Sequence, residues 1–363
     1  MTTSAARVDF PHVPSPDPTP AAQRDGLLAD PGFGRVFTDH VATATWTAGR
    51  GWHDTAVRAA EPLTLHPAAA VLHYAQEVFE GLKAYRQPDG SVALFRPDLN
   101  AARFARSARR LALPELPPEA FVAAVSALVR ADEAWVPEPP ASLYLRPFTV
   151  ATEAFLGVRP AEEARFLVAA SPAGPLFAGR EAGVTLWISD ELSRAAQGGT
   201  GDAKCGGNYA AGLAAQTLAR SHDCDQVLFL DAREHRWLEE SGTMNVLVVT
   251  ADGELATPPL GTILDGVTRR SVLELAAGHG LTPVERPISV EELRAGCADG
   301  SITEVFATGT AAVISPIVAF RSTAGDFAVG DGTPGPHTRA LHAELLDVQF
   351  GRVPDPRGWR VPV

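Results

Sequence analysis

The sequence predicts a mixed fold, α+β or α/β, made of two domains, and three observations lead to this expectation. The chain has 363 residues, whereas single hydrophobic cores stop growing at about 250–300 residues. Hydrophobic residues make up 45% of the chain and charged residues 20%, as in ordinary globular proteins. Short apolar runs typical of strands alternate with amphipathic runs typical of helices along the chain.

We expect four parts, divided by a stretch dense in proline and glycine. They are an amino-terminal arm (1–34), a small α+β domain (35–171), an interdomain linker (172–183) and a large cofactor-binding domain (184–363). Six prolines punctuate the arm, which argues for loose packing there.

In the small domain, the patterns predict strands at 37–46, 79–85, 92–95, 143–150 and 166–170, and helices at 68–78, 100–111 and 119–131. Asn100 is the expected cap of the second helix, which carries Arg103. In the large domain, strands are expected at 184–188, 226–230, 245–249 and 304–307, and helices at 208–221, 267–279 and 337–348.

Composition excludes several classes of function. The net charge of −12 argues against nucleic acid as a partner, and the longest apolar runs fall short of the ~18 residues of a membrane span. The amino terminus does not read as a signal peptide. Three cysteines, an odd number without metal-ligand spacing, indicate neither a disulfide framework nor a metal site. We therefore expect a cytoplasmic protein.

One lysine stands out because lysine is scarce. Of the 31 Lys+Arg residues only Lys83 and Lys204 are lysines, and Lys204 lies in the glycine-rich stretch 198–209. A primary amine can lose its proton when desolvated and condense with an aldehyde to a Schiff base, which arginine cannot do. A solvated loop lysine is about as good an interpretation from this stretch alone.

If Lys204 holds pyridoxal 5′-phosphate, three further parts of the cofactor need binding partners: its phosphate, its pyridine nitrogen and its 3′-oxygen. The phosphate could be bound by residues 265–270, residues 308–311 and Arg103, although small turns before helices are usually only turns. Glu239 or Glu240 could hold the proton of the pyridine nitrogen. Tyr209 could reach the 3′-oxygen if a helix starts between it and Lys204.

The motifs taken together closely resemble those of the class IV, fold-type IV pyridoxal-phosphate enzymes, and within them the branched-chain amino-acid aminotransferases. The resemblance runs from about residue 33 to residue 320 and is carried by residues 33–40, 63–67, 78–85, 94–97, 144–147, 204–209, 240–245 and 304–311. It implies two domains with the cofactor site at their interface.

The resemblance also implies a role for each matching residue. Lys204 would be the catalytic residue, which forms the internal aldimine and then shuttles the proton. The other expected cofactor contacts are Tyr209 at the 3′-oxygen, Glu240 at the pyridine nitrogen, and Arg103, Val267, Thr268 and Thr310 at the phosphate. The implied set contains no metal ligand.

For the substrate, the resemblance implies a carboxylate subsite and an apolar pocket. The carboxylate would bind near Tyr74, Thr243 and Ala311, and Phe37, Phe79 and Tyr144 would wall the side-chain pocket, with Arg146 below it. Arg146 could pair with the second carboxylate of glutamate, or it could hold Tyr144 in position. Leu156 and Val158 match a loop that reaches the neighbouring subunit's site, which implies a homodimer.

The expected activity is transfer of the amino group between leucine, isoleucine or valine and 2-oxoglutarate, with glutamate and the 2-oxo acids as the other reactants. D-amino-acid transaminases and aminodeoxychorismate lyases share the fold and stay open as alternatives. A non-catalytic scaffold is disfavoured because Lys204, Tyr209 and Glu240 are all present.

Overall fold

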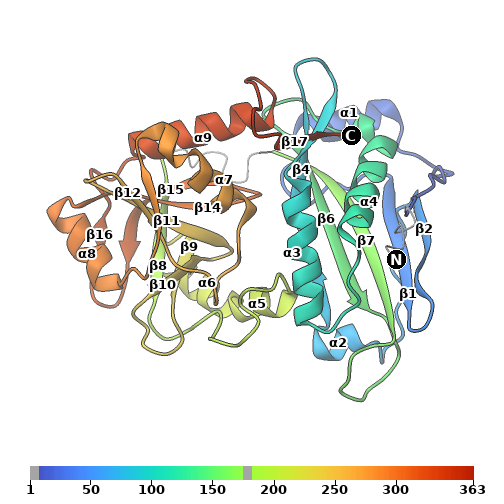
Figure 1. Cartoon of the computed structure of the whole chain (residues 1–363), viewed down its shortest axis with the longest axis horizontal. Helices are drawn as coiled ribbons and strands as arrows, with labels where there is room; N and C mark the ends of the chain where they lie inside the picture. Colours follow the sequence, from blue (N-terminus) through green and yellow to red (C-terminus); the bar gives the residue numbers. More distant parts are fainter. Residues whose placement is uncertain (1–7, 175–181) are drawn as a thin grey trace, which may run out of the picture. The chain divides into compact units, whose positions relative to one another are not determined.

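The computed structural model describes residues 8–174 and 182–363, which divide into two units (Figure 1). Unit 1 comprises Met1–Leu176, Ala203–Gly206 and Val348–Val363, and unit 2 comprises Phe177–Asp202 and Gly207–Asp347. Residues 1–7 of the expected arm and residues 175–181 of the expected linker lie outside the described residues.

Unit 1 is built on a mostly antiparallel sheet in the order β17-β5-β4-β6-β7-β1-β2, with β3 paired to β6. Its strands are β1 (His40–Thr47), β2 (Gly51–Ala59), β3 (Glu77–Phe79), β4 (Leu82–Arg86), β5 (Val92–Phe95), β6 (Ser142–Ala151), β7 (Glu163–Ala173) and β17 (Arg360–Pro362). Its helices are α1 (Ala21–Ala29), α2 (Ala70–Tyr74), α3 (Pro97–Arg110), α4 (Pro118–Ala131) and the 3₁₀ turn η1 (Glu133–Trp135).

Two helices cover this sheet and bury its core. α3 and α4 lie side by side over the strands, with α4 against β1, β2 and β7 (Figure 1). Phe104 of α3, Phe121 of α4 and Phe166 of β7 are each 1% exposed or less, and their ring centroids lie 5.3–6.3 Å apart. Such aromatic contacts add to the stabilisation that comes from burial.

Unit 2 contains a closed ring of strands. Its sheet runs β10-β9-β8-β15-β14-β11-β12-β13, β16 pairs with β15, and β10 also pairs with β11, which closes the ring. Its strands are β8 (Val184–Ser189), β9 (Gln226–Leu230), β10 (Leu238–Ser241), β11 (Met244–Thr250), β12 (Glu254–Thr257), β13 (Thr282–Glu285), β14 (Ile302–Gly309), β15 (Val313–Arg321) and β16 (Phe327–Ala328). Its helices are α5 (Gly206–Ala211), α6 (Leu213–Ser221), α7 (Val267–Leu275), η2 (Ala276–His279), α8 (Val290–Asp299) and α9 (Pro336–Gln349).

The mixed fold class is confirmed, but two expected elements are broken. The helix expected at 68–78 is only the five-residue α2, because Ala75 adopts a left-handed φ of 46° and ends it. The strand expected at 79–85 is split between β3 and β4. At this break the Glu80 N–H bonds the carbonyl of Pro147 and the Glu80 side chain turns into the core.

Two helix boundaries also differ from expectation. α3 starts at Pro97 with Asp98 in its first turn, so Asn100 lies inside the helix and does not cap it. The helix expected at 208–221 is divided at Gly212 into α5 and α6. Over the described ranges, none of the helices combines the length and apolar character needed to cross a membrane.

Candidate functional site

The backbone of Lys204 is held from two sides within unit 1. Its carbonyl accepts a hydrogen bond of 2.9 Å from the N–H of Phe79, at the end of β3. Its own N–H donates to the hydroxyl of Ser107 on α3, also at 2.9 Å. Because the adjoining Gly206 N–H bonds the Glu77 carboxylate as well, the lysine is fixed to rigid elements although it lies in a loop.

The side chain of Lys204 lies among rings and charges. Its Nζ is 4.7 Å from the ring centroid of Phe79. Burial, aided by the positive charges of Arg103 and Arg146 and opposed by the negative charge of Glu80, lowers the pKa of Lys204 to about 8. At pH 7 about one tenth of this amine is therefore neutral, the form that a nucleophile or a proton acceptor requires.

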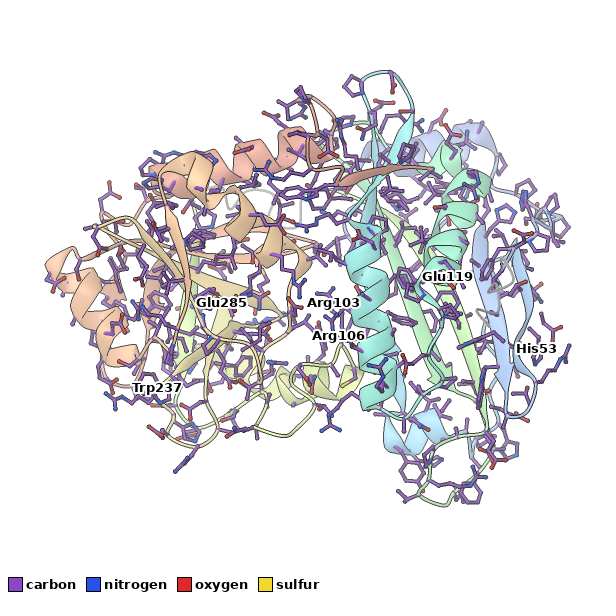
Figure 2. All side chains as sticks on the ribbon, in the orientation of Figure 1. His53, Arg103, Arg106, Glu119, Trp237 and Glu285 are labelled. Carbon is purple, nitrogen blue, oxygen red and sulfur yellow. The ribbon has the colours of Figure 1, made fainter. Side chains whose placement is uncertain are left out.

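A buried ion pair lies beside the lysine. Arg103 donates to Glu80 through Nε at 2.7 Å and through Nη2 at 2.8 Å, and Asn100 Nδ2 donates to the same carboxylate at 2.7 Å. Glu80 is fully buried, yet Arg103 and Asn100 outweigh the effect of burial and lower its pKa. Arg103 is thus locked in place and buried (4% exposed), one helical turn before Arg106 (Figure 2).

An aromatic and guanidinium cluster adjoins this ion pair. The guanidinium carbon of Arg146 lies 4.8 Å from the ring centroid of Phe79 and 5.4 Å from that of Tyr144, and Arg146 Nη2 donates to the Tyr144 hydroxyl at 3.0 Å. Gly81 makes room for this hydroxyl, since a Cβ at that position would lie 2.1 Å from it. The buried Nε of Arg146 has no hydrogen-bond partner among the described residues, so one donor remains for a ligand.

The remaining unit 1 residues expected at the site are exposed. Phe37 precedes β1 and is 61% exposed. Leu156 and Val158 are 63% and 87% exposed, and the hydroxyl of Tyr74 bonds the carbonyl of Leu156. The structure therefore brings Tyr74 together with the loop of Leu156 and Val158.

In unit 2, the glycine-rich stretch is tied to the helix that follows it. Thr200 bonds the amide oxygen of Asn208 at 2.7 Å, and the amide nitrogen of Asn208 bonds the carbonyl of Thr200 at 2.6 Å. α5 starts at Gly206, between Lys204 and Tyr209, as expected. Tyr209 is half-buried in the first turns of this helix.

Glu240 is a buried carboxylate of unit 2 that its neighbours hold in one orientation. Its Oε1 accepts hydrogen bonds from the N–H of Leu264 at 3.0 Å and from Asn245 Nδ2 at 3.2 Å. Its Oε2 lies 2.9 Å from Nε of Arg194, a buried arginine that also bonds the carbonyl of Thr262. These contacts fix the orientation of Glu240 and favour its negative charge.

Two turns and the start of a helix carry the other expected residues of unit 2. Gly242 and Thr243 connect β10 to β11, and Gly242 has a left-handed φ of 58°. Gly266 precedes α7, where Val267 and Thr268 supply the first N–H groups. A Cβ on Gly266 would lie 2.0 Å from the Asn245 side chain, so this position needs glycine. Thr310 and Ala311 lie in the turn between β14 and β15.

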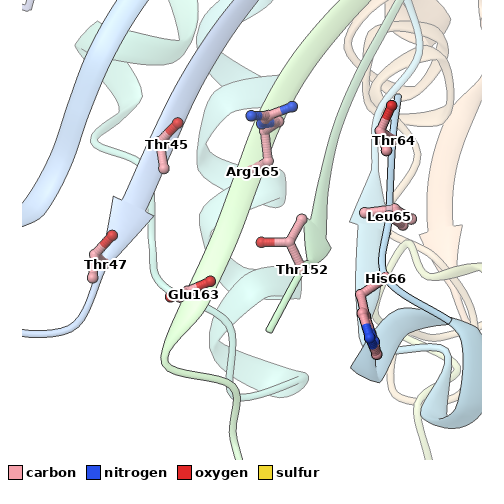
Figure 3. A pocket seen from close by; sticks show the side chains of 8 residues that line it. All are labelled: Thr45, Thr47, Thr64, Leu65, His66, Thr152, Glu163 and Arg165. Atoms are coloured by element: carbon pink, nitrogen blue, oxygen red, sulfur yellow. The ribbon is translucent and has the colours of Figure 1, made fainter. Parts of the chain in front are cut away.

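A pocket of about 340 Å³ lies elsewhere in unit 1 (Figure 3). It is lined by Thr45, Thr47, Thr64, Leu65, His66, Thr152, Glu163 and Arg165, none of which is an expected site residue. Arg165 is exposed, as is Glu163, so the charged groups of this pocket remain in solvent.

Sequence reasoning assigned no role to four groups that organise the site. Glu80 and Ser107 contact Arg103 and Lys204, and Arg194 and Asn245 contact Glu240. A signal existed for Glu80, a carboxylate within the apolar run 78–85 that can be buried only with a partner. For Arg194 the sequence carried no comparable signal.

Comparison with known proteins identifies the family of the chain. The family described as amino-transferase class IV matches residues 77–320. A "Probable branched-chain-amino-acid aminotransferase" of Streptomyces coelicolor is 52% identical, over 95% of this chain and 96% of its own. A "Branched-chain-amino-acid aminotransferase" of Mycobacterium tuberculosis is 51% identical, over 94% of this chain and 95% of its own.

Solved structures show the same fold. The branched-chain amino acid aminotransferase of Escherichia coli superposes with a TM-score of 0.73 at 28% identity, covering 88% of this chain and 98% of its own. The branched-chain aminotransferase of the archaeon Thermoproteus uzoniensis, solved with norvaline, gives a TM-score of 0.72 at 27% identity, covering 88% of this chain and 99% of its own. The chain therefore belongs to the class IV aminotransferases of fold type IV and, within them, to the branched-chain amino-acid aminotransferases.

Proposed function

We propose that the protein transfers amino groups between the branched-chain L-amino acids leucine, isoleucine and valine and 2-oxoglutarate, with pyridoxal 5′-phosphate as cofactor. Relatives with 51–52% identity carry the name of this activity. Solved relatives are bound to pyridoxamine 5′-phosphate and to N-(5′-phosphopyridoxyl)-L-glutamate.

The residues present fit this cofactor. A largely buried amine with a pKa near 8, a buried carboxylate with three oriented partners, and a helix amino terminus opened by a glycine are the groups that its aldehyde, ring nitrogen and phosphate require. When bound, pyridoxal phosphate supplies a carbon that carries the amino group and a ring that delocalises electrons. The residues that would hold it are Lys204, Tyr209, Glu240, Arg103, Val267, Thr268 and Thr310.

Lys204 is the residue that moves the proton. Its backbone is fixed by Phe79 and Ser107, so its Nζ can take a proton and return it with little reorganisation. Its low pKa allows both directions of transfer near neutral pH. Arg194, Asn245 and the N–H of Leu264 hold the carboxylate of Glu240 in one orientation.

The substrate class rests on the cluster of Phe79, Tyr144 and Arg146. The two rings offer apolar surface to a branched side chain, and the guanidinium stacks against both rings. Glutamate needs a partner for its second carboxylate, because an unpaired charge in an apolar pocket is costly. The partnerless Nε of Arg146 is the observation that carries this assignment. We propose that Thr243 and Ala311 bind the carboxylate common to all substrates.

A homodimer, in the cytoplasm, completes the proposal. Exposed apolar side chains gather at one end of unit 1, namely Leu72, Tyr74, Phe155, Leu156 and Val158, with exposures from 36% to 87%. Exposed apolar groups of this kind mark protein interfaces. Since Tyr74 bonds Leu156, we propose that Tyr74 acts with Leu156 and Val158 toward the partner's site, while Phe37 borders the apolar pocket.

Half-reactions measured one amino acid at a time test this function. The holoenzyme is mixed with each L- and D-amino acid, and the change in cofactor absorbance is followed. We expect rapid conversion with L-leucine, L-isoleucine, L-valine and L-glutamate. Conversion by D-amino acids in preference to these would establish the D-amino-acid transaminase alternative.

The variant Arg146→Gln then tests whether Arg146 contributes more to the half-reaction with glutamate than to the half-reaction with leucine. If Arg146 pairs with the second carboxylate, the half-reaction with glutamate loses roughly 2–5 kcal/mol of transition-state stabilisation, while leucine loses much less. Equal losses would instead assign Arg146 to positioning Tyr144, its observed partner. Sedimentation of the wild type checks the dimer, and Val158→Asp should weaken it.

A further inference from the structure

A second pocket, of about 490 Å³, lies within unit 2. It adjoins β10, where a bulge in the pairing with β9 falls between Leu238 and Ser241. Bulges of this kind re-aim side chains and are frequent next to functional sites. Glu239 lines the pocket, together with Ala196, Gln197, residues 231–234, Trp237, Leu238, residues 258–263 and Pro287.

Glu239 has an unmatched oxygen in this pocket. The residue is 3% exposed, and its Oε2 has no hydrogen-bond partner among the described residues. Arg194, which is near enough to act on it electrostatically, ion-pairs with Glu240 at 2.9 Å. Burial raises the pKa of Glu239, although a hydrogen bond with Thr262 and the charge of Arg194 act in the opposite direction. A buried carboxylate oxygen without a donor calls for a bound donor.

The rest of the lining holds two acidic residues, Asp231 and Glu234, one basic residue, Arg233, and apolar surface. The carboxylate of Asp231 accepts four backbone N–H groups at 2.8–3.1 Å, which, against the opposing effect of burial, lower its pKa to about 2 and keep it negative. Glu234 accepts a hydrogen bond of 3.2 Å from the indole of Trp237, which fixes that ring near the start of β10 (Figure 2). Pro258, Leu260 and neighbouring residues supply apolar surface.

We propose that this pocket binds a small organic cation, an amidinium or guanidinium with an apolar substituent. The planar cation donates to Glu239 in the fork geometry that carboxylates accept, and its substituent lies against Trp237 and the prolines. The volume suits such a ligand, since small-molecule sites usually measure about 300–1,000 Å³. Glu239 and Glu240 are neighbours in one strand, and the charge of Arg194 acts on both. A ligand bound to Glu239 therefore lies next to Glu240, the residue expected to bind the pyridine nitrogen.

Titration calorimetry on the holoenzyme tests the proposal with benzamidine and n-butylguanidine. These probes are chosen because primary amines would condense with the cofactor aldehyde. We expect saturable binding of one equivalent per chain. Benzamide, which has the same shape without the charge, should not bind.

Three variants locate the binding. Glu239→Gln removes the charge and should weaken benzamidine at least about tenfold, as expected for the loss of a hydrogen bond to a charged group. Glu119→Gln makes the same change of charge on the exposed surface of α4 and should leave affinity unchanged. Leu260→Trp, at a position that is 44% exposed, should obstruct the pocket even if Glu239→Gln fails to fold.

Several results would overturn the proposal. One is the absence of binding to the wild type up to the solubility limit of both probes. A second is equal affinity for benzamide, and a third is affinity that is unchanged in both Glu239→Gln and Leu260→Trp. If Leu260→Trp loses affinity for the probe while a folded Glu239→Gln retains it in full, apolar contacts alone bind the probe. This result would also reject the cation site.

Discussion

The two lysines of the chain lie in the same unit, and burial lowers the pKa of each to about 8, yet their surroundings differ. Lys83 lies within β4, between β5 and β6 in the sheet, and burial is the cause of its low pKa. Lys204 lies in a loop, clamped by Phe79 and Ser107, where Arg103, Glu80 and Arg146 also act on its charge. A lowered pKa alone therefore does not distinguish the two amines, and the proposed role of Lys204 rests on the charges and backbone contacts around it.

The largest expected effect comes from exchanging each lysine in turn for methionine, which keeps an unbranched chain without the amine. Lys204→Met should lose activity by ~10²–10⁴-fold or more, because the proton shuttle is removed. Lys83→Met should retain activity within a few-fold. Steady-state rates measure both, and borohydride reduction followed by peptide mapping should label Lys204. A cofactor trapped on Lys83 would instead identify Lys83 as the amine that binds the cofactor.

The next largest effect is expected at Glu80, the carboxylate that acts on the charge of Lys204. Glu80→Gln leaves Arg103 buried without its ion-pair partner and should lower the free energy of unfolding by about 3–5 kcal/mol. Glu153→Gln is the matched control in the same unit, since its pair with the more exposed Arg159 is worth about 0–1 kcal/mol. Urea denaturation of the apoenzyme measures both. Equal losses in the free energy of unfolding would show that the buried pair stabilises the protein no more than the exposed pair does.

A smaller effect is expected in the pH dependence of cofactor binding. Only the neutral amine of Lys204 can attack the cofactor aldehyde, and its pKa is lowered from 10.5 to about 8. The rate at which apoenzyme recombines with pyridoxal phosphate should rise with pH up to about 8 and then level off. Stopped-flow absorbance measures this rate. A rise that continues toward pH 10.5 would indicate an amine with the ordinary lysine pKa.

The smallest effect is expected next to the reactive lysine. Cys205 is buried (2% exposed), and the chain has no Cys-x-x-Cys motif, so we expect a packing role. Cys205→Ser should change the rate little and leave sensitivity to mild peroxide as in the parent. Complete peroxide resistance in this variant would give the thiol a function beside Lys204.

Local patterns predicted some elements closely. The strand at 92–95 and the helix ending at residue 131 were predicted to the residue, because periodicity and proline at a helix start are local signals. The left-handed conformation of Ala75 was not predictable, since alanine rarely adopts it. The pairing of Glu80 with Arg103 joins positions 23 residues apart, so no local pattern specifies it. The assigned roles of Tyr209, Glu240 and the other site residues came from family resemblance and stay predictions.

The division of the chain between the units has a consequence for synthesis. Unit 1 needs Ala203–Gly206 and Val348–Val363 besides its first 176 residues, and β17 adds the last strand to β5 through Val361 and Leu94. The N–H of Val363, the final residue, donates to the carbonyl of Val92 at 3.0 Å. A growing chain therefore cannot complete unit 1 until residues 348–363 have been synthesised and have left the ribosome. A chain truncated before residue 348 carries its reactive lysine in an unfinished domain.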